Sequence, residues 1–165
     1  MYVFAHVGFT LLTILFLSKT RIIKKSIDYR LVVIGSMLPD IIDKPLNLFS
    51  ISAGRGYAHT LVFFIILYVI SRHFGKEEIA YAHLMHLFLD GLICSPGVLF
   101  WPFYGYSFDS TGYTVKMYVD VVCTNVKVQV SEAFGLGAVT FFYFYAQLYK
   151  IPNMINMMLR GTLSD

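Results

Sequence analysis

Apolar residues gather into five long runs along the chain, separated by short polar stretches. The runs cover residues 2–18, 31–49, 58–72, 79–95 and 133–149. At about 1.5 Å per residue, each run would reach about 22–28 Å as a helix, slightly less than the ~30 Å hydrocarbon core of a bilayer. The pattern predicts an all-α membrane protein. It would be a bundle of about five short transmembrane helices in a single integral-membrane domain over residues 1–165.

The stretch between the fourth and fifth runs, residues 96–132, departs from this pattern and is predicted to be an outer loop. Its first part is rich in Pro, Gly and aromatic residues, which suit a membrane–water boundary. The segment YTVKMYVDVVCTNVKVQV (113–130) is β-branched and partly alternating, with CTN as a possible turn. This segment predicts a small β-hairpin-like insert before the last helix. The final residues, 151–165, predict a short amphipathic helix at the inner surface.

Composition supports the membrane class. Hydrophobic residues make up 57% of the chain and charged residues only 14%, whereas soluble domains carry about a quarter charged residues. The net charge of +3, without a basic patch interleaved with aromatics, argues against a nucleic-acid partner. Cys94 and Cys123 fit no CxxC metal or redox pattern. They are interpreted as ordinary residues, with a disulfide as the alternative.

The distribution of basic residues predicts the orientation. Three basic residues, Arg55, Lys116 and Lys127, would lie outside if the N-terminus is outside. Nine would face the cytoplasm: Lys19, Arg21, Lys24, Lys25, Arg30, Arg72, Lys76, Lys150 and Arg160. This positive-inside bias predicts a multi-pass protein of the inner (plasma) membrane, with its N-terminus outside and its C-terminus in the cytoplasm.

Ionisable residues inside the apolar runs form the candidate site. Such groups cost at least ~2.5–3.5 kcal/mol each at membrane depth, so they indicate function by default. In the predicted orientation most of them fall in the outer halves of four different helices, which predicts one shared site. Imidazole and carboxylate ligands suit zinc, manganese or iron, and the lack of clustered Cys excludes a thiolate site. The candidate metal ligands are His6, Asp40, Asp43, His59, His83, His86 and Asp90.

This ligand set suits one or two divalent ions, zinc first, with manganese or iron as alternatives. A water acidified by the metal would act as the nucleophile. Asp43, Arg55 and Lys44 are the candidate catalytic residues, and the Arg55 fork suits a phosphate. Each residue also has a simpler interpretation. His6 and His83 could be hydrogen-bonded core residues, the aspartates could cap a helix break at Pro39, and Lys44 could extend to the surface.

Five sequence blocks resemble the YdjM-type family in order and approximate spacing. They are AHVGFT (5–10), GSMLPDIIDKP (35–45), GRGYAHT (54–60), HLMHLFLDGL (83–92) and PGVLFWPF (96–103). That family is described as LexA-binding and inner-membrane-associated, and its members are predicted metal-dependent hydrolases. The resemblance implies that His6, Asp40, Asp43, His59, His86 and Asp90 bind metal, with Arg55 in an Arg-Gly-x-x-His motif.

The chain departs from the family pattern at two histidines. Lys44 stands where better-known members carry one of them, and Gly54 stands where they carry the other, just before the arginine. His83 could replace one of the two. The two missing histidines would be ligands of a second metal ion, so the departures concern whether the site holds one ion or two.

Three functions fit these residues. The first is a membrane-embedded metal-dependent hydrolase that cleaves a lipid-linked phosphoester or ester at the outer leaflet, with a membrane lipid or lipid-linked molecule as its substrate. The second is a cation-binding transporter or channel lined by the same side chains. The third is a structural or regulatory membrane protein stabilised by metal, without catalysis.

Overall fold

A computed structural model describes residues 3–23, 25–48, 55–105, 108 and 114–163 of the chain. In these ranges all regular secondary structure is helical. The elements are α1 (Val3–Lys19), α2 (Tyr29–Leu48), η1 (Tyr57–His59), α3 (Leu61–His73), α4 (Glu78–Leu89), η2 (Leu92–Cys94), α5 (Pro96–Leu99), α6 (Val115–Thr124), α7 (Val126–Tyr145) and α8 (Ile151–Arg160). The predicted runs 2–18 and 31–49 correspond closely to α1 and α2, and the run 58–72 corresponds to η1 and α3.

The last two predicted helices have different bounds. Gly91 adopts φ +67°, a left-handed conformation that glycine tolerates, and α4 therefore ends before it. The run 79–95 is thus divided between α4 and η2. The predicted helix 133–149 begins earlier, at Val126 of α7, because the Asn125 side chain accepts hydrogen bonds from the backbone N–H groups of Lys127 and Val128.

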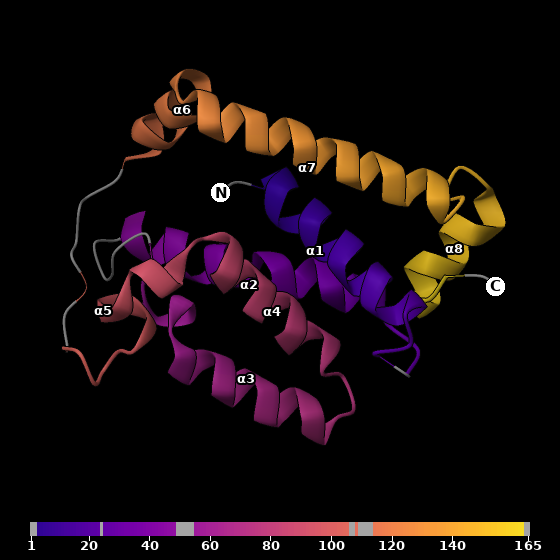
Figure 1. Ribbon diagram of the computed structural model, residues 1–165, viewed down its shortest axis with the longest axis horizontal. Helices are drawn as coiled ribbons and strands as arrows, with labels where there is room; N and C mark the ends of the chain where they lie inside the picture. The colour runs from indigo at the N-terminus through magenta and orange to yellow at the C-terminus, as the bar shows by residue number, and fades with distance from the viewer. Residues whose placement is uncertain (1–2, 24, 49–54, 106–107, 109–113, 164–165) are drawn as a thin grey trace.

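The predicted β-hairpin-like insert is wrong, because the described part of residues 96–132 contains helices and no strand. The Thr114 side chain caps α6 by accepting a hydrogen bond from the backbone N–H of Met117. At the other end of α6, the Gln129 amide donates to the carbonyls of Val122 and Cys123. The residues CTN form the junction of α6 and α7 (Figure 1). These caps override the weak strand preference of β-branched residues.

The predicted bundle of transmembrane helices is also wrong for the described residues, since none of their helices combines the length and the apolarity needed to cross a membrane. Helix α1 has 17 residues and α4 has 12. These lengths correspond to about 26 Å and 18 Å, against a hydrocarbon core of ~30 Å. Helix α2 has 20 residues, but its sequence includes Arg30, Asp40, Asp43 and Lys44.

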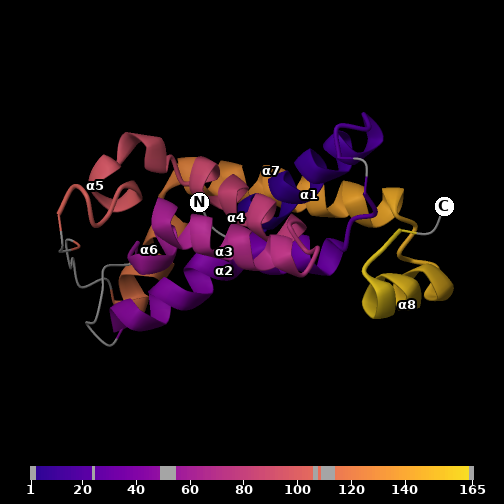
Figure 2. The same cartoon turned by 90° about the horizontal axis from the view of Figure 1, so that it is seen from below.

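Helix α7 packs along α1. Helices α1 and α4 both pack against α2, and α3 packs against α4 (Figures 1 and 2). Helix α8 and the C-terminus lie at one end of the molecule, and α5 lies at the other. The buried core between the helices is formed by Leu11, Ile14, Leu15, Ile27, Tyr29, Val32, Ala82, Phe142 and Ala146.

Glycines bring two pairs of these helices into backbone contact. A Cβ atom at Gly8 of α1 would collide with the Gly135 carbonyl of α7, and one at Gly135 would collide with the backbone of Phe4 and Ala5. Gly35 of α2 lies in the same way against the Ile79 carbonyl of α4. Because interiors pack at crystal-like density, such contacts leave no room for a methyl group.

The predicted C-terminal amphipathic helix is present as α8, and hydrogen bonds from Arg30 hold it to the start of α2. The Arg30 guanidinium donates to the carbonyls of Met158 and Leu159 at 3.1 and 2.8 Å. Asp28 holds the same guanidinium through Nη2 at 2.7 Å. One side of α8 therefore faces the bundle, while its apolar side chains Ile151, Met154, Ile155, Met158 and Leu159 are exposed.

The Gly8–Gly135 contact predicts opposite effects for two matched substitutions in α7. Gly135→Ala should destabilise the protein by about 1–3 kcal/mol, because the methyl group would force α1 and α7 apart. Gly137→Ala should stabilise it by about 0.5–1 kcal/mol, because a Cβ there meets no atom within 4 Å and alanine is the better helix former. Chemical denaturation of both variants measures the difference, and equal effects would contradict the close helix packing.

Candidate metal centre

Imidazole and carboxylate side chains from four parts of the chain meet at one end of the bundle. Helix α1 provides His6, α2 provides Asp40 and Asp43, η1 provides His59, and α4 provides His86, with Asp90 at its C-cap. The residues His6, Asp43, His59 and His86 are 0% exposed, and Asp40 is 6% exposed. Such burial requires each polar group to have a partner.

Asp43 orients His59. Its Oδ2 atom lies 2.6 Å from His59 Nδ1, and its two oxygens also accept hydrogen bonds from the backbone N–H groups of Gly56 and Ala58. The carboxylate therefore holds both the ring and the backbone before it. With Nδ1 donating to Asp43, the Nε2 atom of His59 points into the cluster.

A backbone carbonyl orients His86 in the same way. Nδ1 of His86 lies 2.7 Å from the Ser36 carbonyl, which can only accept, so Nδ1 must carry the proton. Ser36 lies beside a gap in the helical hydrogen bonds of α2, because Pro39 has no N–H to donate to the Gly35 carbonyl. Burial first, and the neighbouring His6 second, lower the pKa of His86 to about 2. His86 is therefore neutral, with an unprotonated Nε2.

The two oriented rings bring their Nε2 atoms within 3.3 Å of each other. Burial alone would lower the pKa of His59, but its hydrogen bonds to Asp43 and Asp90 outweigh burial and raise that pKa. A proton on His59 Nε2 would satisfy the contact, whereas two neutral rings would place two lone pairs face to face. A proton or another cation is thus needed between the two nitrogens.

Asp90 links three neighbours of this cluster. Its Oδ1 atom lies 3.1 Å from His6 Nε2, and its Oδ2 atom lies 3.0 Å from Arg55 Nε and 3.6 Å from His59 Nε2. Burial opposes the charged form of Asp90, but hydrogen bonds from His59 and His6 and the charge of Arg55 hold its pKa well below the usual range. Asp90 is therefore a carboxylate. The His6 ring also stacks on His86 at 4.0 Å between centroids.

Asp40 completes the cluster from α2. Its Oδ1 atom lies 3.8 Å from His59 Nε2, and its Oδ2 atom accepts a hydrogen bond from Lys44 Nζ at 2.7 Å. Lys44 and Arg55 are 31% and 43% exposed, so two positive side chains lie at the border between the buried cluster and the surface.

The donor set fits a metal ion. Two groups have one ligand atom per residue within 4.8 Å of one another, His6 with Asp40 and His86, and His59 with His86 and Asp90. Zinc–nitrogen bonds of ~2.0–2.1 Å in a tetrahedron separate neighbouring ligands by about 3.3 Å. The distance between His59 Nε2 and His86 Nε2 has this value. The second nitrogen of each ring is held by an acceptor, as in metal sites generally.

Two predicted ligands lie outside these groups. Asp43 is behind His59, and both of its oxygens accept hydrogen bonds from η1 and the residues before it. His83 donates from Nε2 to the Ala58 carbonyl at 2.9 Å and packs against the rings of Phe63 and Phe64. The structure thus gives Asp43 an orienting position and His83 a packing position.

Two contributors were missed by the sequence analysis. Ser36 acts through its backbone carbonyl, which leaves no side-chain signal. Glu132 of α7 accepts hydrogen bonds from the backbone N–H groups of Phe4 and Ala5, at 3.0 and 3.1 Å, and so fixes the start of the helix that carries His6. An acidic residue beside the apolar run 133–149 could have indicated this second contact.

Comparison with known proteins identifies one family. The family model described as YdjM inner membrane protein matches residues 1–154. No curated protein and no solved structure matches the chain.

His83 predicts a pH dependence of stability. Burial lowers its pKa to about 4, below the unfolded value of about 6.5, so the unfolded chain binds the extra proton first. Above pH 6.5 His83 is neutral in both states and does not lower the stability. As the pH falls from 6.5 toward 4, the unfolded chain gains a proton that the folded protein does not bind, so the free energy of unfolding decreases. His83→Phe should reduce the pH slope of the unfolding free energy in this window by up to ~1.4 kcal/mol per pH unit.

Urea unfolding of metal-free protein at pH 7, 6 and 5 measures this slope. His73→Phe is the matched control, because His73 is exposed at the end of α3. The control should retain the wild-type slope, and a wild-type slope in His83→Phe would refute the assignment.

Proposed function

The chain belongs to the YdjM inner membrane protein family, and we propose that it is a metal-dependent hydrolase of a lipid phosphoester or ester. One observation carries the proposal. Two buried imidazole nitrogens, His59 Nε2 and His86 Nε2, lie 3.3 Å apart, and the opposite nitrogen of each ring is held by an acceptor. Such a pair is arranged for a cation rather than for a hydrophobic core.

The candidate ligands on this proposal are His6, His59, His86, Asp40 and Asp90, of which a catalytic zinc would use three and keep its fourth position for water. Three nitrogens with carboxylate oxygens match zinc best, with manganese or iron as alternatives. Both candidate groups include His86, and only its Nε2 faces the cluster, so we propose a single ion. A metal bound there supplies a Lewis acid and lowers the pKa of a water, which is the chemistry that ester hydrolysis needs.

The surrounding residues have distinct tasks. Asp43 holds His59 in the tautomer whose Nε2 is directed inward, so it acts as a positioning residue. Arg55 and Lys44 stand at the exposed border of the cluster, on Asp90 and Asp40 respectively. Their positive charges would bind and orient the phosphate of a substrate and stabilise the negative charge that grows on it.

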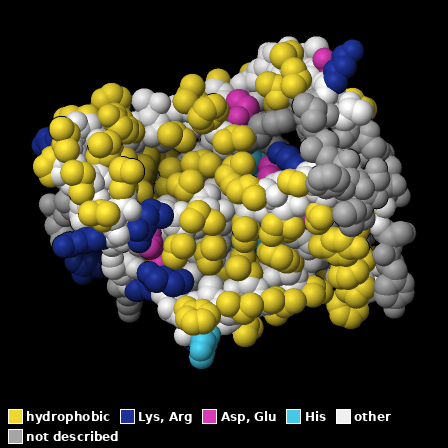
Figure 3. Space-filling view, turned by 180° about the vertical axis from the view of Figure 1, so that it is seen from behind, with side chains coloured by type: hydrophobic (Ala, Val, Ile, Leu, Met, Phe, Trp, Pro, Cys, Tyr) yellow, Lys and Arg dark blue, Asp and Glu magenta, His cyan; other side chains and the backbone are white. Residues whose placement is uncertain are grey.

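A lipid substrate agrees with the surface of the protein. Large apolar side chains are exposed in groups, such as Ile65, Ile66, Val69 and Ile70 of α3. Figure 3 shows that hydrophobic side chains dominate one face of the molecule. Contiguous apolar surface of this kind marks membrane contact. The predicted outer-leaflet position and N-out, C-in orientation assume membrane-spanning helices, and the described residues contain no helix of that kind, so neither forms part of this proposal.

The metal should be measured first. Elemental analysis of purified wild-type protein should find about one equivalent of zinc, manganese or iron, and His86→Ala and Asp40→Asn should lose it. The matched control His73→Ala changes an exposed histidine far from the cluster and should keep the metal. Wild-type protein without bound metal, even after metal addition, would rule out a metal-dependent hydrolase.

Hydrolysis is then tested on the metal-loaded protein with phosphatidic acid and phosphatidylglycerol in vesicles. Arg55→Ala should keep its metal and lower kcat/KM by about 10-fold or more, because one positive contact to the phosphate is lost. Full metal occupancy with no turnover of any lipid ester would favour the structural interpretation of the metal instead.

A further inference from the structure

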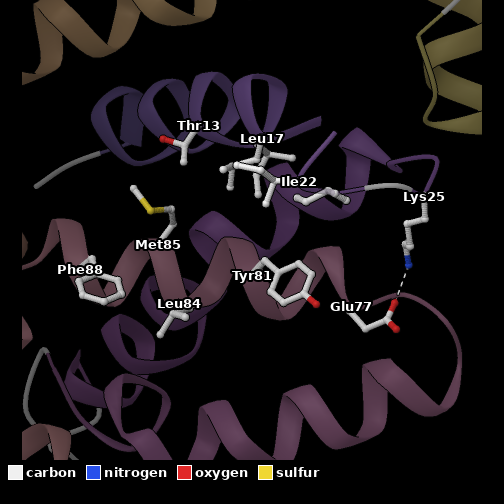
Figure 4. A pocket seen from close by; sticks show the side chains of 11 residues that line it. Thr13, Leu17, Ile22, Lys25, Glu77, Tyr81, Leu84, Met85 and Phe88 are labelled. Carbon is white, nitrogen blue, oxygen red and sulfur yellow. Dashed lines mark hydrogen bonds and ion pairs between the residues drawn. The ribbon is translucent and has the colours of Figure 1, made fainter. Parts of the chain in front are cut away.

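A second feature of the fold is an apolar groove of about 610 Å³ between α1 and α4 (Figure 4). Its walls include Ile14 and Leu17 of α1, Ile22 of the following turn, and Leu84, Met85 and Phe88 of α4. The volume lies within the ~300–1,000 Å³ typical of ligand sites, and the lining is mostly hydrocarbon. None of these residues belongs to the candidate metal centre.

One end of the groove is closed by an ion-paired cluster of one lysine and two glutamates. Lys25 Nζ lies 2.6 Å from Glu77 Oε2 and 2.8 Å from Glu78 Oε2, and it also donates to the Gly75 carbonyl. Figure 4 shows the Lys25–Glu77 pair at the opposite end of the groove from Phe88. Because this lysine is already paired with two carboxylates, it offers little attraction to a charged head group.

The other end leads toward the metal centre. Helix α4 ends one residue beyond Phe88, and the carboxylate of its C-cap residue Asp90 is paired with the exposed Arg55 guanidinium. On α1, the residues His6, Thr10, Ile14 and Leu17 follow one another at helical spacing, so one face of α1 runs from the cluster into the groove. In Figure 3 a band of hydrophobic side chains has charged side chains at both of its ends.

We propose that the groove binds a hydrocarbon chain of the lipid substrate, with the phosphate at Arg55 and the chain lying between α1 and α4. The choice of a phosphate-bearing lipid rests on the proposed function. The apolar walls, the far end whose lysine is paired with two glutamates, and the positive charge at the near end fit an amphiphile with one anionic end. From Glu77, the N-cap of α4, to Phe88 the wall rises by eleven residue steps, about 16 Å. The length of the groove therefore limits how many carbons of the hydrocarbon chain it can hold.

The first test is photocrosslinking in phosphatidylcholine vesicles with dodecyl phosphate that carries a diazirine on its last carbon. The probe should label groove residues near Tyr81 and Ile22. Leu84→Trp and Leu17→Trp fill the groove from opposite walls and should each reduce labelling at least fivefold. Ile66→Trp is the matched control, since it adds the same ring to an exposed position on α3. Equal labelling in all these proteins would overturn the proposal.

The second test separates this inference from the proposed function. With alkyl phosphodiesters of 4 to 14 carbons, each methylene held in the groove should improve kcat/KM by up to about fourfold. Leu84→Trp should abolish this dependence and leave the shortest substrate unaffected. If Leu84→Trp still hydrolyses the esters with an unchanged dependence of kcat/KM on chain length, the groove is not the chain site, although the proposed function stands.

The opposite result is equally informative. Groove labelling that Leu84→Trp blocks, in a protein that cleaves no ester, would support the chain site and refute the hydrolase. The same labelling should survive in His86→Ala, because that residue lies outside the groove. Crosslinks joining two copies of the protein, also blocked by Leu84→Trp, would show that a second copy occupies the groove and would overturn the lipid assignment.

Discussion

The structure depends on the approach of two imidazole nitrogens, His59 Nε2 and His86 Nε2, at 3.3 Å. Neither ring can turn away, because Asp43 holds Nδ1 of the first and the Ser36 carbonyl holds Nδ1 of the second. Two lone pairs facing each other in a buried site are unfavourable without a positive charge between them. The arrangement therefore fits a proton or another cation between the two rings, and the remaining contacts position the parts of the cluster.

Close helix packing brings the ligands within reach. Gly8 and Gly135 allow α1 to approach α7, Glu132 fixes the first residues of α1, and both contacts locate His6. Gly35 performs the same task between α2 and α4, which locates His86. Because the five candidate ligands come from four different elements, small errors in helix packing would separate the nitrogens and carboxylates. This requirement explains why the smallest residue stands at these crossings.

The sequence indicated more of the site than of the architecture. His6, Asp40, His59, His86 and Asp90 could be selected because ionisable groups in apolar runs need a reason to be there. The chemistry of Ser36 could not be read, since a backbone carbonyl has no sequence signature. The strand prediction for residues 113–130 failed because β-branched propensity is weak against the caps at Thr114 and Asn125. The spanning prediction failed partly because Gly91 divides the fourth run.

The charges of the site favour an anionic ligand once a cation is bound. Asp40, Asp43 and Asp90 supply three negative charges, and Lys44 and Arg55 supply two positive charges at the border. With neutral imidazoles, one negative charge is left over, which would repel a phosphate. A bound divalent ion changes the net charge of the site from −1 to +1. This sum includes the positive charges of Lys44 and Arg55 at the exposed border. Because the site has a low dielectric constant, this change of sign strongly alters the interaction energy with a phosphate. On the proposed function, binding of the metal and binding of an anionic lipid head group would therefore be coupled by the same small set of side chains.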